Sequence, residues 1–174
     1  IKNPNNAVVS GLALVPENRR TEGLLIEEPI FKNLTLTSLE KFSILSFLNF
    51  NKEKKAVSKK INELNIKTPS EKQKVALLSG GNQQKVAVGK WLILDAQVYI
   101  FDEPTKGIDV GAKKEIYELI MTLASQGKSI IYATCETQEI LGLCDRAYIM
   151  YGGKISKEII PQESSEEEIV YYSV

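Results

Sequence analysis

At 174 residues the chain is long enough for one compact domain with a hydrophobic core and too short for two ordinary ones. Hydrophobic residues make up 43% and charged residues 25%, which is typical of a globular protein. Lysine plus arginine and aspartate plus glutamate balance at 22 each, which argues against nucleic acid or an anionic membrane surface as a partner. Cys135 and Cys144 lack metal-ligand spacing, so a reducing cytoplasm fits better than a disulfide scaffold or a zinc site.

No apolar run reaches the ~18–20 residues that a membrane helix needs, because polar residues interrupt even Phe42–Phe50. The sequence therefore predicts a soluble protein whose membrane role would run through a partner. The chain opens at Ile1 rather than Met, which we expect of a piece of a longer protein.

The first half predicts one strand followed by helices. Val8–Pro16 is an apolar run ending in proline and predicts a strand that enters a polar loop. From Leu36 to Leu94 the pattern is helical. The apolar residues that recur at helical spacing are Leu39, Phe42 and Leu45, then Val57, Ile61 and Leu64. Ser79-Gly80-Gly81 interrupts this stretch, and Asn82–Leu94 predicts a helix.

The second half predicts alternating strands and helices. Its expected elements are a strand at Gln97–Phe101, a helix capped by Asp109, a strand at Ser129–Thr134, a helix at Gln138–Leu143, a strand at Ala147–Tyr151 that turns at Gly152-Gly153, and a helix at Glu166–Tyr172 capped by Ser164 or Ser165. This alternation predicts a mostly parallel sheet with a helical insert at roughly 33–95.

Two acids end the predicted strand before residue 104. Parallel strands place such residues in the usual ligand crevice. Asp102 could hold Mg²⁺ through water, and Glu103 could polarise a water for attack on a γ-phosphate. A solvated strand terminus is the simpler alternative. The Pro-Thr-x-Gly-x-Asp that follows favours the catalytic interpretation.

Ser79-Gly80-Gly81 lies at a predicted helix start. Two glycines let the backbone approach a ligand closely, and the free N–H groups of a first helical turn attract an anion. An ordinary turn that caps a helix is the alternative. The position just upstream of a strand ending in Asp-Glu favours phosphate binding.

Together, Leu-Ser-Gly-Gly-Asn-Gln-Gln-Lys at Leu78–Lys85 and Val-Tyr-Ile-Phe-Asp-Glu at Val98–Glu103 resemble the signature and hydrolysis strand of ATP-binding cassette (ABC) ATPases. Pro-Glu-Asn-Arg-Arg at 16–20 and Lys-Gly-Ile-Asp-Val-Gly-Ala-Lys at 106–113 are similar to the second cassette half of double-cassette ATPases that drive bacterial monosaccharide import, of the ribose, galactose and xylose kind. The likeness runs from about Asn6 to Lys154.

The resemblance implies an α/β fold: a partial P-loop NTPase (RecA-like) core with a parallel sheet, plus a helical ABC subdomain. It divides the chain into 1–32 (core strand and Q-loop region), 33–95 (helical subdomain with the signature) and 96–174 (core with Walker B, D-loop, switch region and C-terminal tail). It implies ATP and Mg²⁺ as ligands, with these roles: catalysis by Glu103; Mg²⁺ through water at Asp102; the D-loop at Asp109; and Ser79, Gly80, Gly81 and Asn82 on an ATP held by the partner cassette half.

Three features depart from the family pattern. Glu17 stands where the family has the Q-loop glutamine, and Cys135 stands at the switch histidine in a chain without any histidine. Cys135 cannot supply the same donor or charge, and a small buried apolar residue at a strand end is the simpler interpretation. No phosphate loop of the form G-x-x-x-x-G-K-[ST] occurs. The best near-match is Gly127-Lys128-Ser129, but Thr122 stands where the motif has its first glycine, and the segment leads into a predicted strand instead of a helix.

The resemblance implies the ATP-hydrolysing subunit of a monosaccharide importer, present as a C-terminal cassette fragment that is inactive alone. Its expected partners are a second cassette half, a transmembrane permease at the cytoplasmic face of the membrane and, indirectly, a periplasmic or extracellular sugar-binding protein, with no nucleic acid. A nucleoside importer of the same architecture is an alternative. So is a soluble cassette protein acting on nucleic acid or the ribosome, which the zero net charge and short insert disfavour, and a module without turnover, which the intact Glu103 disfavours.

In the resembled core the phosphate-loop strand lies between Ser129–Thr134 and Ala147–Tyr151. Without it, strand edges would lack partners. We therefore expect the flanking strands to close up or rearrange, or a second copy of the chain to fill the gap by strand exchange or edge pairing.

Overall fold

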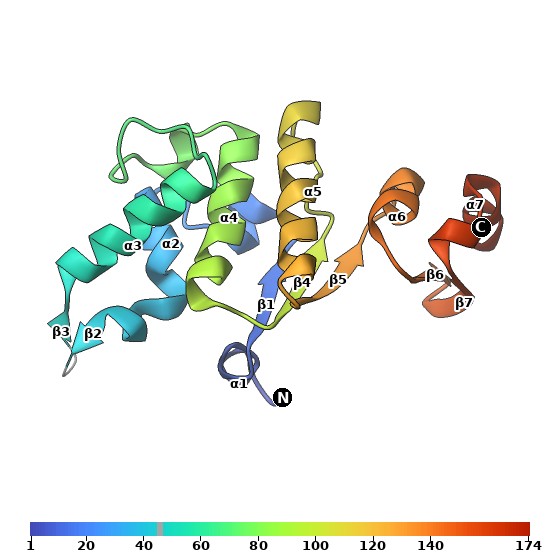
Figure 1. Ribbon diagram of the computed structural model, residues 1–174, viewed down its shortest axis with the longest axis horizontal. Helices are drawn as coiled ribbons and strands as arrows, with labels where there is room; N and C mark the ends of the chain where they lie inside the picture. Colours follow the sequence, from blue (N-terminus) through green and yellow to red (C-terminus); the bar gives the residue numbers. More distant parts are fainter. Residues whose placement is uncertain (45–46) are drawn as a thin grey trace. The chain divides into compact units, whose positions relative to one another are not determined.

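The computed structural model describes residues 1–44 and 47–174 and comprises two compact units, 1–131 and 132–174 (Figure 1). The first unit contains helices α1 (Pro4–Val9), α2 (Ile30–Thr35), α3 (Phe50–Glu63), α4 (Gly80–Leu94) and α5 (Val110–Ser125), strands β1 (Leu12–Val15), β2 (Ser43–Ile44), β3 (Phe47–Leu48) and β4 (Val98–Asp102), and helical turns η1 (Arg19–Gly23), η2 (Leu36–Phe42) and η3 (Val75–Leu77). Strand β5 (Ser129–Ala133) crosses into the second unit, which continues with α6 (Thr137–Leu143), β6 (Ala147–Tyr151), β7 (Lys154–Ile159), η4 (Pro161–Glu163) and α7 (Glu166–Tyr172). Within the described ranges, no helix combines the length and apolar character that crossing a membrane requires.

A three-stranded sheet in the order β1-β4-β5 forms the floor of the first unit. Strand β1 pairs in parallel with β4, with Leu12 opposite Val98 and Val15 opposite Phe101. Because the two strands run in the same direction, the loop after β1 and the acids after β4 leave from the same edge of the sheet. The predicted α/β fold with a parallel sheet is confirmed.

Helices α2, α3 and α4 lie side by side in the first unit and share a hydrophobic core (Figure 1). Its fully buried members include Ile30 and Leu34 of α2, Val57 of α3 and Val86 of α4. Helix α4 is buried at Gly81 and along 83–91, and hence on all sides. A helix packed in this way cannot shift without disturbing its neighbours.

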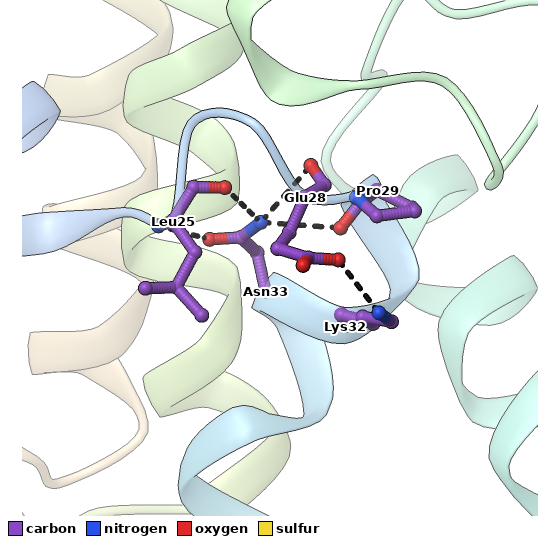
Figure 2. A network of polar contacts seen from close by, with 5 residues as sticks. All are labelled: Leu25, Glu28, Pro29, Lys32 and Asn33. Carbon is purple, nitrogen blue, oxygen red and sulfur yellow. Dashed lines mark hydrogen bonds and ion pairs between the residues drawn. The ribbon is translucent and has the colours of Figure 1, made fainter.

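Asn33 organises the loop that joins η1 to α2 (Figure 2). The side chain is 1% exposed. Its Oδ1 accepts from the Leu25 amide at 2.8 Å, and its Nδ2 donates to the carbonyls of Leu25 at 2.9 Å and Pro29 at 3.1 Å. A buried side-chain amide that pairs with several backbone groups fixes this loop, because those groups would otherwise be buried without hydrogen-bond partners.

The structure corrects two sequence-based assignments. Within the stretch predicted as helical, Leu36–Phe42 is a 3₁₀ helix and β2 and β3 form a two-residue antiparallel pair, so helix does not run through; Leu45 lies outside the described residues. Helix α1 also covers Val8 and Val9, where the sequence predicts the start of the strand. Asn3 caps α1 by accepting from the Asn6 amide at 2.8 Å, a local signal of helix initiation.

The second unit is built around an antiparallel hairpin. Strand β6 pairs with β7 across the predicted turn at Gly152-Gly153, and Ile149, Ile159 and Ile169 form its buried core. Ser165 caps α7, as predicted. In the described residues β6 and β5 belong to different sheets, so the two strands do not close up by pairing with each other. Edge pairing with a second copy stays a prediction.

Candidate functional site

Ser79 starts α4 as its N-cap. Its Oγ accepts from the Asn82 amide at 3.4 Å and from Asn82 Nδ2 at 2.9 Å. Both bonds use the acceptor side of the hydroxyl, so the O–H can still donate to a ligand. Asn82 Oδ1 accepts in turn from the Lys67 amide at 2.9 Å, which holds the turn to the preceding loop.

The two glycines of this turn are required for space. A Cβ on Gly81 would lie 2.5 Å from the Cβ of Ala112 in α5. A Cβ on Gly80 would lie 2.9 Å from Arg19 Nη2 and 3.1 Å from the Gly107 carbonyl oxygen. The start of α4 is therefore packed directly against the stretch that leads into α5.

That stretch is closed by Asp109, the N-cap of α5. Asp109 Oδ1 accepts from the Ala112 amide at 3.0 Å, as the sequence predicted. One turn further along, Lys85 Nζ of α4 pairs with Glu115 at 2.6 Å. The structure thus brings the signature residues and Asp109 together at two neighbouring helix starts.

The loop after β1 reaches the same place through Arg19. Its Nη1 and Nη2 donate to the carbonyls of Lys106 at 2.9 Å and Gly107 at 3.1 Å. Burial, and next the charge of Arg20, lower the pKa of Arg19 below its usual value. Beside it, Lys106 Nζ pairs with Glu17 at 2.5 Å, and a cavity of about 200 Å³ opens among the side chains of this loop and Lys106.

Lys90 ties the middle of α4 to η1. It is 7% exposed, and its Nζ donates to the Gly23 carbonyl at 2.5 Å while lying 5.1 Å from the centre of the Trp91 ring. Burial lowers its pKa to about 8. A cationic lysine in such a place is held by its acceptor and by the aromatic face.

The acids that end β4 are open by comparison. Asp102 is exposed, and Glu103 is half-buried with a φ of +44°, in the left-handed region that costs a residue with a Cβ about 1 kcal/mol. In the described parts of the chain, no three histidine, cysteine or acidic side chains gather as a metal site. One exposed carboxylate is nevertheless enough to bind Mg²⁺, because the ion keeps most of its water ligands and takes few ligands from the protein.

The structure corrects the sequence-based interpretation of one residue and adds two residues to which the sequence assigns no role. Cys135 is exposed, so its interpretation as a buried apolar residue is wrong; it follows β5 in the second unit. Arg19 and Lys90 were not singled out. Lys90 has a signal, a lone charge in the otherwise apolar run Val86–Leu94, whereas Arg19 is marked only by the Pro-Glu-Asn-Arg-Arg motif, which indicates the family but no role for that arginine.

Comparisons with known proteins identify the family of the chain. A family described as ABC transporter matches residues 7–106. The ribose import ATP-binding protein RbsA of Chelativorans sp. (strain BNC1) is 43% identical over 174 residues, all of this chain and 34% of its own length. The xylose import ATP-binding protein XylG of Moorella thermoacetica (strain ATCC 39073 / JCM 9320) is 47% identical over 170 residues, 98% of this chain and 34% of its own length.

A solved structure, the crystal structure of a nucleotide-free ATP-binding cassette from an ABC transporter, superposes with a TM-score of 0.73 at 21% identity. The alignment covers 98% of this chain and 68% of that one, and it supports the fold. The chain spans about a third of the length of the curated relatives it matches. On the family match, which covers more than half of its residues, the chain belongs to the ABC transporter family.

Proposed function

We propose that the chain is the second-cassette part of a longer ATP-hydrolysing protein that energises the import of a monosaccharide. The observation that carries this proposal is the signature turn: Ser79, Gly80 and Gly81 start a fully packed helix, beside Asp109. The import of ribose and xylose by the relatives named above supports the substrate class.

In this function the signature turn serves an ATP held by the phosphate loop of a partner cassette half. The first N–H groups of α4, the Ser79 hydroxyl and the small Gly80 and Gly81 would meet the γ-phosphate, with Asn82 supporting the turn. A helix start favours an anion because its N–H groups and dipole are directed toward it. Asp109, as part of the D-loop, would lie in the same composite site.

The strand-end acids serve a second ATP, held by this half's own phosphate loop. Glu103 would take up the proton of the attacking water, and Asp102 would hold Mg²⁺ through water. Glu17, paired with Lys106, occupies the Q-loop position, and Cys135 the switch position. Since a thiol lacks the donor and charge of imidazole, we expect slow hydrolysis at this second ATP.

The partners follow from the same proposal. Residues 33–95 form the helical subdomain that docks on a transmembrane permease at the cytoplasmic face of the membrane. Residues 1–32 and 96–174 contribute to the nucleotide-binding core. The sugar reaches the permease through a periplasmic or extracellular binding protein, and nucleic acid has no part.

The full-length protein reconstituted with its permease in vesicles tests the proposal. We expect ATP-dependent uptake of labelled ribose or xylose when the matching sugar-binding protein is added, and loss of uptake in Ser79→Arg, where bulk fills the phosphate position. Lys54→Arg, an exposed position on α3, is the matched control. ATP-driven uptake of a nucleoside instead of a sugar, or full uptake by Ser79→Arg, would contradict the proposal.

The isolated chain offers a second test. Its 174 residues contain no phosphate loop, which supplies the backbone cradle and lysine for the β- and γ-phosphates. We therefore expect very weak Mg-ATP binding and no turnover in the chain alone. Calorimetry that shows micromolar binding of Mg-ATP without a partner would contradict the proposal that a phosphate loop outside this chain holds the nucleotide.

A further inference from the structure

Arg19 connects three stretches of chain that are distant in sequence. Its guanidinium donates to the carbonyls of Lys106 and Gly107, 87 and 88 residues away. The same Nη2 lies 2.9 Å from where a Cβ on Gly80 would stand. We propose that Arg19 is a positioning residue that fixes the D-loop (106–109) against the signature turn (79–82), so that both meet one nucleotide in register. The inference rests on the proposed function.

The bonding pattern needs a planar fork. Two nitrogens of one guanidinium hold two consecutive carbonyl oxygens, at 2.9 Å and 3.1 Å. Consecutive carbonyls point apart in an extended chain, and the φ of +68° at Gly107 lets both face one side chain. A lysine ammonium is a point charge without this fixed geometry, so Arg and Lys are not equivalent here.

Stability alone explains this arrangement poorly. Arg19 Nε is buried and finds no hydrogen-bond partner among the residues that the structure describes. Leaving a buried donor unpaired opposes folding and offsets part of what the two other bonds contribute. The side chain therefore fixes a geometry, namely the close approach of the Gly107 carbonyl to Gly80.

Arg20 provides a matched control. It has the same charge, lies in the same helical turn and is exposed. Within 1–44 and 47–174 its side chain makes no hydrogen bond or ion pair. If only charge near the site matters, substitution of either arginine should lower activity. If the two hydrogen bonds of the guanidinium matter, only substitution of Arg19 should do so.

The test uses the full-length ATP-binding protein with its permease and compares Arg19→Gln, Arg19→Lys and Arg20→Gln. We expect Arg19→Gln to lower kcat for ATP roughly ten- to a hundredfold, the range that small misplacements in a site cause. The KM for ATP should change less than about twofold, because the phosphate loop of the partner half still grips the nucleotide. Arg19→Lys should keep the melting temperature but lose most of the turnover, and Arg20→Gln should match the wild type.

Hydrogen exchange adds a readout that a general loss of stability would not reproduce. Amides at 80–81 and 107–109 should exchange faster in both Arg19 variants, with the rest of the first unit unchanged. Wild-type kcat in Arg19→Lys, or an equal loss in Arg20→Gln, would overturn the inference, and Arg19→Lys decides if Arg19→Gln does not fold. If the wild type itself hydrolyses no ATP, the proposed function fails, and exchange at Gly80 and Gly107 then decides whether Arg19 joins the two loops.

Discussion

The signature turn and the end of β4, which the proposed function assigns to two different ATP molecules, are built in opposite ways. At the signature turn, Gly81 lies where a Cβ would stand 2.5 Å from Ala112, and α4 is buried behind it. At the end of β4, Asp102 is exposed and Glu103 is half-buried on a left-handed backbone. The first part is shaped by packing within the chain, while the second is partly open to solvent.

This difference separates two kinds of evidence for function. A substitution in the packed part should change both stability and turnover, because the same contacts serve both. A substitution in the open part that keeps the size of the side chain should change turnover more than stability, because fewer packing contacts depend on it. The predictions that follow test this division, in order of decreasing effect on the free energy of unfolding.

Gly81→Ala should produce the largest loss. The new methyl group would overlap the Ala112 methyl group, and two buried helices would have to separate. We expect the free energy of unfolding to fall by about 3 kcal/mol, as overpacking of a core does, with ATPase activity lost in the full-length protein. Urea unfolding measures the change.

Gly142→Ala is the matched control for that prediction. Gly142 lies in α6 with no atom within 4 Å of its would-be Cβ, so alanine should be neutral or stabilise by up to about 1 kcal/mol. Equal effects at positions 81 and 142 would show that the packing at the signature turn is not what distinguishes it.

Lys90 should make stability depend on pH. Its pKa is about 8 in the folded chain against 10.5 when unfolded, so between these values the unfolded state binds more protons. The free energy of unfolding should therefore rise with pH from about 8 to 10.5, by at most about 3 kcal/mol, and show no such slope below pH 8. The bond to the Gly23 carbonyl and the Trp91 ring favour the charged form and reduce the amplitude.

Denaturant midpoints measured across this pH range check the effect. Lys90→Met should remove the slope, while Lys54→Met, on the exposed face of α3, should keep it. A slope that persists in Lys90→Met would assign the titration to another group.

Glu103→Gln should change the free energy of unfolding by less than about 0.5 kcal/mol, because the amide fills the same half-buried position. The amide keeps the size of the side chain but cannot act as a base. In the full-length protein, ATP affinity should stay near the wild-type value while the turnover of this half's own site disappears. Since the proposed function expects slow hydrolysis at the site with Cys135, the total ATPase loss should be partial, and Glu118→Gln on α5 should cause none. Weaker ATP binding with unchanged turnover would argue against the catalytic role.

Much of this site could be predicted because its signals are local. Ser79 caps α4 and Asp109 caps α5, and both caps depend on a side chain and an amide three residues apart. The contacts of Arg19 with the D-loop join residues almost ninety positions apart, and neither end carries a pattern that names the other. The short β2–β3 pair could not be predicted either, because strands of two residues are too short to show the alternation of apolar and polar residues that marks a strand.

Glu103→Gly should give a change in stability as small as that of Glu103→Gln, and its sign should be favourable. Glycine relieves the strain of the left-handed backbone, worth about 1 kcal/mol, and loses part of this gain to the greater freedom of the unfolded chain. We expect a net gain of up to about 0.5 kcal/mol together with the loss of turnover at this site. A destabilised Glu103→Gly variant would mean that contacts of the carboxylate outweigh the backbone strain.

The backbone at Glu103 also matters for protein engineering. A library of this chain sorted only for thermal resistance or expression would enrich glycine or asparagine at position 103, since these residues tolerate a φ of +44° best. Such a selection would remove the acid to which the proposed function assigns the role of the base. Designers who stabilise the cassette should therefore hold position 103 fixed and seek their gains elsewhere, for example at exposed helical positions.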